Sequence, residues 1–310
     1  MFRYIVRRIL MMIPVLLGVS FIIFTIMEFT PGDPAMLMLG ENATSSEVNE
    51  LREEMGLNEN FFVRYFKYIN DAVKGDFGIS YRNKVPVSKE ITSRLNNTLK
   101  LTTLGVLISV IIGVPVGIIS AVKQYSIIDY ASLITALILT SLPAFFVGLM
   151  LILLFSLYLN WLPSTGADSW KNFVMPAITL AAASMATLIR MTRSTMLEVI
   201  RQDYIRTARA KGATEKRVIY KHALRNALLP VVTLIGLNFG TQLGGAIVTE
   251  TVFTMPGLGS LMIAAVRTKD TPIVMAAVIT IAVIAGFINL FVDILYTFID
   301  PRLKSDLVKN

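Results

Sequence analysis

The segment DYIRTARAKGATEKRVIYKHALRN, residues 203–226, is a basic island in a chain that is otherwise mostly apolar. The wider stretch 190–226 holds ten Lys or Arg against three acids, whereas 172–189 before it and 227–249 after it contain no charged residue. A basic segment between two apolar runs is typical of a loop outside the hydrocarbon of a membrane. The island therefore predicts a surface that contacts either anionic lipid or another protein.

The composition indicates an all-α polytopic membrane protein. Of the 310 residues, 54% are hydrophobic and only 16% are charged, and the mean hydropathy is +0.64. A net charge of +8 without interleaved aromatic residues does not predict nucleic acid as a partner. The chain has no Cys and a single His, His222, so thiol chemistry is excluded and neither a metal site nor a membrane enzyme is predicted.

Six windows almost free of charge are long enough to cross a bilayer, which takes about 20 apolar residues. The first follows Arg3, Arg7 and Arg8; it is too long for a signal peptide, and no small-x-small cleavage site follows it. The third contains Pro143 and Gly148, which predict a kinked or tilted span. The predicted spans are 9–27, 101–122, 130–159, 173–189, 227–248 and 273–292.

The distribution of Lys and Arg predicts that both termini are cytoplasmic. The island and the tail, which carries Arg302, Lys304 and Lys309, then lie inside, whereas 28–99 carries more acids than bases and lies outside. Three parts follow: 1–29 with the first span, 30–99 as an extracytoplasmic helical insertion, and 100–310 as a core with spans two to six and the loop 190–226.

Local signals predict helices outside the spans. TSSEVNELREEMGL reads as a helix that Ser46 caps and Gly56 ends, and FFVRYFKYINDAV has helical apolar spacing. In TVFTMPGLGSLMIAAV, the Pro256-Gly257 turn precedes an apolar run too short to span, which predicts a re-entrant or surface helix facing outside.

The island itself is predicted to be a helix, a glycine turn and a second helix. Met196, Ile200, Tyr204 and Ala208 form one apolar stripe of the first helix, which ends at Gly212. Thr214 is in position to cap the second helix, with Glu215 near its positive end. A defined turn favours a protein partner, and a basic surface lying on anionic lipid is the alternative.

The island resembles the EAA motif, Glu-Ala-Ala, three residues and Gly, of permeases of ATP-binding cassette (ABC) importers. The motif aligns with 206–212, ending at Gly212, although its first two positions depart from the consensus and the expected Leu-Pro is displaced to 229–230. Further stretches resemble the dipeptide and oligopeptide (peptide/nickel) branch of these importers: TPGDP (30–34), GDFGIS (75–80), ETVFTMPGLGSLM (250–262) and DILYTFIDPRL (293–303).

This resemblance implies a type I ABC importer permease with six transmembrane helices in a bacterial or archaeal cytoplasmic membrane. Its implied partners are a homologous second permease subunit, two ATPase subunits, an extracytoplasmic peptide-binding protein and membrane lipid. No cofactor is implied in this chain, since ATP and Mg²⁺ are bound by the partner subunits. The residues implied to couple the permease to the ATPases are Tyr204, Arg206, Thr207, Ala208, Arg209, Lys211, Gly212, Ala213, Glu215 and Arg217.

The rest of the sequence agrees with a permease driven by other subunits. It contains no phosphate-cradling G-x-x-x-x-G-K-[ST] motif, so an ATPase must be another chain. A secondary transporter, the alternative mechanism, needs ionisable groups deep in the membrane, whereas Glu28, Glu250 and Asp293 stand near span ends. Nickel complexes and glutathione remain alternatives to peptides as the substrate.

Two spans carry ridges of small residues that favour close helix packing: Gly105, Ser109, Gly113 and Gly117 on the second, and Gly236, Gly240 and Gly244 on the fifth. Asn238, Gln242 and Thr249 fall on the face of the fifth span opposite its glycines. These three are predicted to line the translocation path; the alternative is that they hydrogen-bond a neighbouring helix.

Overall fold

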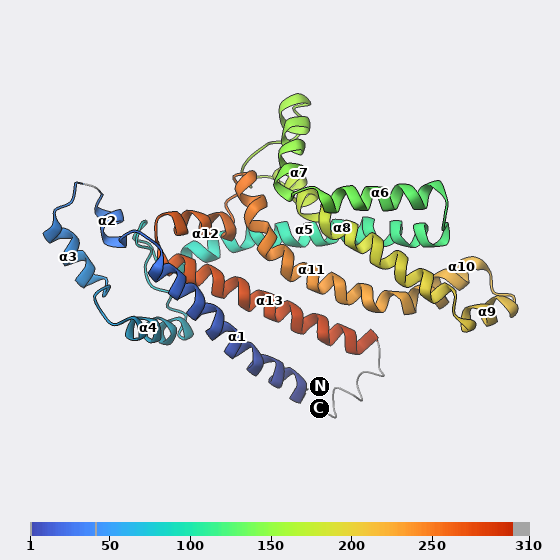
Figure 1. The fold of residues 1–310 in the computed structure, drawn as a ribbon, viewed down its shortest axis with the longest axis horizontal. Helices are drawn as coiled ribbons and strands as arrows, with labels where there is room; N and C mark the ends of the chain where they lie inside the picture. The colour runs from blue at the N-terminus through green and yellow to red at the C-terminus, as the bar shows by residue number, and fades with distance from the viewer. Residues whose placement is uncertain (1, 41, 300–310) are drawn as a thin grey trace. The chain divides into compact units, whose positions relative to one another are not determined.

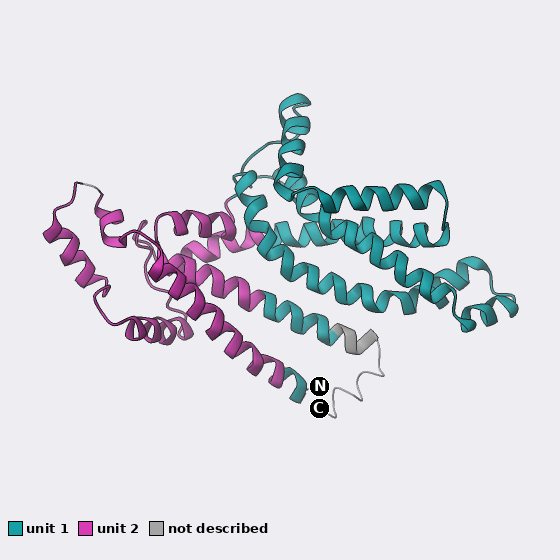
Figure 2. Cartoon of the chain, in the orientation of Figure 1, with its two compact units in different colours: residues 1–5, 99–255, 285–310 teal, residues 6–98, 256–284 magenta. Residues whose placement is uncertain are grey.

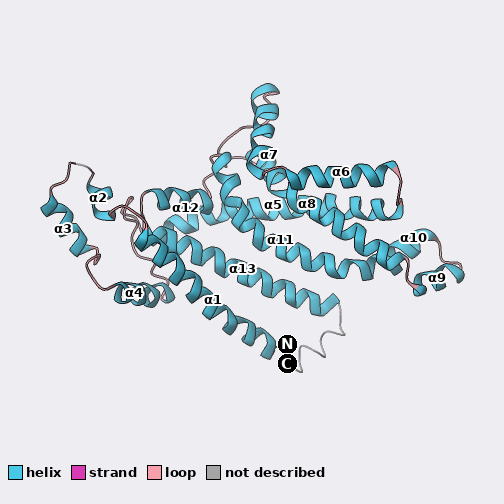
Figure 3. Cartoon of the chain, viewed as in Figure 1, coloured by secondary structure: helices cyan, strands magenta, loops and turns pink. Residues whose placement is uncertain are grey.

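The computed structural model describes residues 2–40 and 42–299, which are mostly helical and, apart from one isolated bridge between Ile79 and Pro86, contain no strand (Figure 3). The chain divides into two compact units (Figure 2). Unit 1 comprises 1–5, 99–255 and 285–310, and unit 2 comprises 6–98 and 256–284. The basic tail predicted at Arg302, Lys304 and Lys309 and the end of the 293–303 motif lie outside the described residues.

Among the described residues, five helices are long and apolar enough to cross a membrane, and they match five of the six predicted spans (Figure 1). One of them is the continuous helical run Glu215–Val252, made of α10, the π-helix η2 and α11. The helices are α1 (Phe2–Phe29), α2 (Pro34–Leu39), α3 (Ser45–Glu54), α4 (Phe61–Val73), α5 (Val87–Val122), α6 (Ile127–Ser141), α7 (Ala144–Leu151), η1 (Ile152–Tyr158), α8 (Lys171–Ile200), α9 (Asp203–Ala210), α10 (Glu215–Arg217), η2 (Val218–Ala223), α11 (Leu224–Val252), α12 (Leu258–Arg267) and α13 (Thr271–Ile299).

The predicted third span is not one kinked helix but two. The helix α6 and the pair α7–η1 meet at 103°, with Leu142 extended and Pro143 at the corner. Proline has no N–H to continue the helix and disfavours the α conformation of the residue before it, which explains the break. By length and composition, the described residues therefore hold five helices that could span a membrane, or up to six if the bent pair crosses as one.

The predicted small-residue ridge of the second span is confirmed in unit 1, where it brings α5 close to α8. A Cβ built on Gly113 lies 3.0 Å from the Met185 carbonyl oxygen, and one on Gly117 lies 2.8 Å from that of Ile189. The ridge of the fifth span is used only in part. Gly236 meets Val292 of α13, whereas a Cβ on Gly240 has no described atom within 4 Å outside its own helix.

The segment between the first two spans forms the predicted helices, with one cap displaced. Thr44, and not Ser46, caps α3: its hydroxyl accepts from the Glu47 N–H while the Glu47 carboxylate accepts from the Thr44 N–H at 2.8 Å. This reciprocal pair needs a glutamate three residues after the cap, which Ser46 lacks. Gly56, at φ +65°, ends the helix as predicted.

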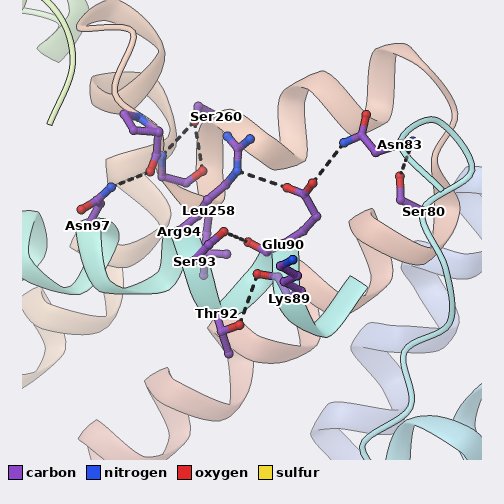
Figure 4. A network of polar contacts seen from close by, with 12 residues as sticks. Ser80, Asn83, Lys89, Glu90, Thr92, Ser93, Arg94, Asn97, Leu258 and Ser260 are labelled. Atoms are coloured by element: carbon purple, nitrogen blue, oxygen red, sulfur yellow. Dashed lines mark hydrogen bonds and ion pairs between the residues drawn. The ribbon is translucent and has the colours of Figure 1, made fainter. Parts of the chain in front are cut away.

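The predicted short helix after the Pro256-Gly257 turn is confirmed as α12, which belongs to unit 2. Polar groups of α5 hold the turn, and Figure 4 shows one of them, the side chain of Asn97. The Asn97 side-chain amide donates to the Pro256 carbonyl at 2.9 Å, and the Leu258 N–H donates to the Thr98 hydroxyl at 2.8 Å. Leu258 and Leu261 are buried in a cluster with residues of α1, α5 and α13. The helix is therefore packed into its unit.

Candidate functional site

The segment 201–217, called the elbow below, is a helix, a tight turn and a second helix, as predicted. Its first helix is not continuous with the preceding span, however: α8 ends at Ile200, and α9 begins after an extended Gln202. For this reason the predicted apolar stripe is wrong at Tyr204, although Met196, Ile200 and Ala208 do pack in one cluster. The break changes the facing of α9, so that Ile205 is fully buried and Tyr204 is 43% exposed.

The turn at Gly212 has the hydrogen bonds of a Schellman motif. The Gly212 N–H donates to the Arg209 carbonyl at 2.9 Å, and the Ala213 N–H donates to the Ala208 carbonyl at 3.2 Å. Gly212 has φ +77°, a conformation that side chains with a Cβ rarely adopt. The glycine cap is confirmed. Thr214 occupies the N-cap position of α10, but its hydroxyl makes no capping hydrogen bond.

An ion pair closes the elbow across its turn. The Arg209 guanidinium donates to both Glu215 carboxylate oxygens, from Nε at 2.7 Å and from Nη2 at 3.2 Å. Both side chains are substantially exposed, so the pair contributes on the order of 1 kcal/mol or less. Its main consequence is geometric, because the two-pronged contact holds the end of α9 against the start of α10.

The inner side of the elbow is fixed to three long helices of unit 1. Ile205 of the elbow and Val218, which directly follows it, are fully buried in a cluster with Ile118 of α5, Met196 of α8 and Ala227 of α11. The second arm of the elbow runs without a break into α11. A displacement of the elbow must therefore displace the ends of these helices, since a packed core of this kind does not stretch.

The outer side of the elbow is basic and accessible. Ala208 and Ala213, two of the predicted coupling residues, are half-buried against the chain's own cluster, whereas Ala210 is exposed. A hollow of about 440 Å³ opens beside the turn and is lined by Thr214, Lys216, Arg217, Tyr220 and Lys221. The other predicted contact residues are exposed: Tyr204, Arg206, Thr207, Arg209, Lys211, Gly212, Glu215 and Arg217.

The predicted pathway residues lie in different environments. Gln242 is 5% exposed, and its amide donates to the Ser184 hydroxyl of α8 at 2.7 Å. This is the helix-to-helix bond that the sequence left open as an alternative. Among the described residues, Asn238 Nδ2 and Thr249 Oγ1 are buried without a hydrogen-bond partner. A path-lining role stays a prediction for Asn238 and Thr249, whereas for Gln242 the bond to Ser184 favours the alternative.

A buried ionic centre near the end of α8 was not predicted from the sequence. Asp129 of α6 is 1% exposed and accepts from Arg193 Nε at 2.6 Å and Nη2 at 2.9 Å, from the Ser120 hydroxyl and from the Tyr125 N–H. It joins α5, α6 and α8 at the helix ends that precede the elbow. The available signal was that Asp129 and Arg193 carry charge just inside apolar helices, where an unpaired charge is costly.

Comparisons with known proteins agree with this geometry. Residues 113–305 match the family described as "Binding-protein-dependent transport system inner membrane component", and 1–102 match its N-terminal component. The chain is 42% identical to the dipeptide transport system permease protein DppB of Alkalihalophilus pseudofirmus, covering 98% of this chain and 100% of that protein. It is 43% identical to the glutathione transport system permease protein GsiC of Escherichia coli K12 and to the oligopeptide transport system permease protein AppB of Bacillus subtilis, covering 98% of this chain and 99% and 100% of those proteins.

Two solved structures share the fold. The MetNI methionine ABC transporter in an inward-facing conformation superposes with a TM-score of 0.54 at 20% identity, covering 67% of this chain and 95% of that chain. An amino acid ABC transporter superposes with a TM-score of 0.52 at 19% identity, covering 69% and 94%.

The long apolar helices, the basic elbow and these matches define a multi-pass membrane permease of the type I ABC importer class. The chain belongs to the family of inner membrane components of binding-protein-dependent transport systems. It is a non-catalytic subunit, since ATP hydrolysis in such importers resides on separate subunits.

Proposed function

We propose that the chain forms one half of a peptide-importing path and that its elbow docks on an ATPase subunit. The other half of the path is a homologous permease, two ATPase subunits bind ATP and Mg²⁺, and an extracytoplasmic binding protein delivers the peptide. The observation that carries this proposal is the two-sided elbow: its inner side is packed on α5, α8 and α11, and its outer side is basic and free of this chain.

This arrangement allows the elbow to transmit a movement of the ATPase subunit to the membrane helices. A short helix pair held in a partner's groove transmits displacement because its contacts are rigid. The Schellman turn and the Arg209–Glu215 pair fix the angle between its arms. The chain works in a bacterial or archaeal cytoplasmic membrane. The elbow lies on the cytoplasmic side of that membrane, as the excess of Lys and Arg in 190–226 supports.

Elbow variants separate docking from folding. Ala210→Trp adds bulk to an exposed position, so we expect loss of ATPase co-purification with normal membrane insertion. The rim variant Arg206→Ala should cost about 1 kcal/mol or less. Lys123→Trp, on the exposed turn between α5 and α6, is the matched control outside the elbow. Full assembly and normal substrate-stimulated hydrolysis with Ala210→Trp would leave the elbow as a lipid-facing charged surface.

The peptide substrate rests on the relatives named for dipeptides and oligopeptides. A relative named for glutathione, itself a small peptide derivative, agrees with that class, and nickel complexes are a further outcome. Titration of the partner binding protein with di-, tri- and pentapeptides, glutathione and nickel chelates tests it. We expect retention of a peptide; retention of a metal chelate alone overturns the assignment.

Cysteine labelling tests the predicted path, and the native chain has no Cys to interfere. Asn238→Cys is expected to react with a water-soluble thiol reagent in at least one transport state. Gln242→Cys is expected to stay protected in every state, because that side chain is bonded to Ser184 inside the unit. Protection of Asn238→Cys throughout the cycle would remove it from the path.

A further inference from the structure

We infer that α4 lies in the lipid headgroup–acyl boundary and presents an aromatic stripe to the membrane. The helix belongs to unit 2 and lies within the segment 30–99, which the sequence predicts to be outside the membrane. Phe62, Phe66 and Val73 recur at spacings of four and seven residues, which places them on one stripe. They are 57%, 64% and 83% exposed, whereas Tyr65 on another side of the helix is buried.

The contacts of α4 set its level along α1. The Tyr65 hydroxyl lies 3.0 Å from both the Leu17 carbonyl oxygen and the Ser20 hydroxyl. The charge-free window of α1 ends at Met27, seven to ten residues further on. At 1.5 Å per residue, Tyr65 therefore reaches roughly 10–15 Å inside the end of that window.

The contacts of α4 with α13 place it at the same depth as its contacts with α1. Met275 is fully buried in the cluster of α4 with Phe24 and Tyr65, and Ile279 packs against it. Both belong to α13 and lie inside the apolar window that begins at Ile273. Since α1 and α13 are membrane spans at these residues, a helix packed on them cannot stand clear of the bilayer.

Ring contacts link α1 to the aromatic stripe of α4. Phe21 of α1 stacks edge-to-face on Tyr65 with 5.3 Å between ring centroids, and Tyr65 contacts Phe66 at 5.6 Å. Phe61 likewise contacts Phe62 at 5.3 Å. Next to these rings, Ile22 on α1 is 58% exposed, as expected of a residue that touches lipid tails.

The charges beside the stripe fit a membrane surface and not a buried protein interface. Lys67 and Lys74 lie on one flank with side chains 65% and 66% exposed. Long Lys side chains at such positions extend toward headgroups while their stems cover apolar surface. An amphipathic helix with aromatic residues on one side and Lys beside them is the pattern of helices that lie in the membrane plane.

Depth-sensitive spin labelling of the assembled transporter in lipid nanodiscs, with cysteines removed from the other subunits, tests this placement. The label is attached at Phe66→Cys and at Phe62→Cys. Lys67→Cys is the matched control, because its side chain is as exposed as that of Phe66 but lies 100° further around the helix. Ile22→Cys supplies the lipid reference, and Asn49→Cys, exposed on α3, supplies the aqueous one.

We expect labels at 62 and 66 to be relaxed several-fold more by oxygen than by a water-soluble nickel reagent, as at 22, with the reverse at 67 and 49. Equal aqueous accessibility at 66, 67 and 49 would overturn the proposal. Shielding of 62 and 66 from both reagents would also overturn it, since a protein partner would then cover the stripe.

Discussion

Gly117→Leu is expected to force α5 away from α8 and to prevent assembly of a stable permease. A Cβ at Gly117 already lies 2.7 Å from the Thr192 Cβ and 2.8 Å from the Ile189 carbonyl oxygen. The obstacle includes backbone, which cannot rotate aside as a long side chain can. Overpacking of this kind costs roughly 1–3 kcal/mol. A full leucine side chain at a helix crossing is expected at the upper end of that range.

Single methyl groups supply the matched comparison. Gly117→Ala adds a methyl at the crossing, whereas Gly240→Ala adds one where no described atom lies within 4 Å outside its own helix. Thermal unfolding of the purified chain should show a clear drop for the first and little change or a small gain for the second, since Ala is a better helix former than Gly. Equal melting temperatures for the two alanine variants would mean that α5 and α8 are not in contact at this glycine.

Arg193→Met is expected to destabilise unit 1 by about 3–5 kcal/mol, because it leaves the Asp129 carboxylate buried without its counter-charge. Arg193 supplies two of the four donors of that carboxylate. Arg209→Met removes an ion pair of the same two-pronged geometry from the exposed elbow, where a loss of 1 kcal/mol or less is expected. Thermal unfolding and ATPase stimulation measure both variants.

The double variant Asp129→Leu with Arg193→Met separates pairing from packing. Removing both charges should restore part of the stability lost by Arg193→Met alone, since the buried charge is gone. If the double variant were no more stable than Arg193→Met, the Arg193 side chain would stabilise unit 1 by packing. The buried Asp129 carboxylate would then not need the positive charge of Arg193.

The sequence predicted the parts of this protein that depend on local chemistry. Charge-free windows predicted six spans, of which five match long apolar helices, and a glycine after a periodic segment predicted the turns at Gly56 and Gly212, both at positive φ. The glycine spacing on the second span predicted its crossing with α8. In each case the residues that form the sequence pattern also make the contacts or the turn. The pattern alone was therefore enough to predict the structure.

The predictions failed where the local structure depends on a contact with residues far away in the sequence. The break before α9 depends on how Ile205 enters a cluster with residues of α5 and α11, which helical periodicity near Tyr204 does not report. The 103° corner at Pro143 was read as a kink because the strength of a proline break depends on what packs around it. Asp129 and Arg193 are 64 residues apart, and only the fold brings them together.

The most direct test of the elbow as the docking site is photo-cross-linking from inside it. A benzophenone amino acid replaces Ala210, which is exposed on the outer side, and in a separate variant it replaces Asn49 on α3. After irradiation of the assembled transporter, adducts are identified by mass spectrometry. We expect an ATPase adduct from position 210 and none from position 49. Lipid adducts alone from position 210, in a complex that hydrolyses ATP normally, would contradict it.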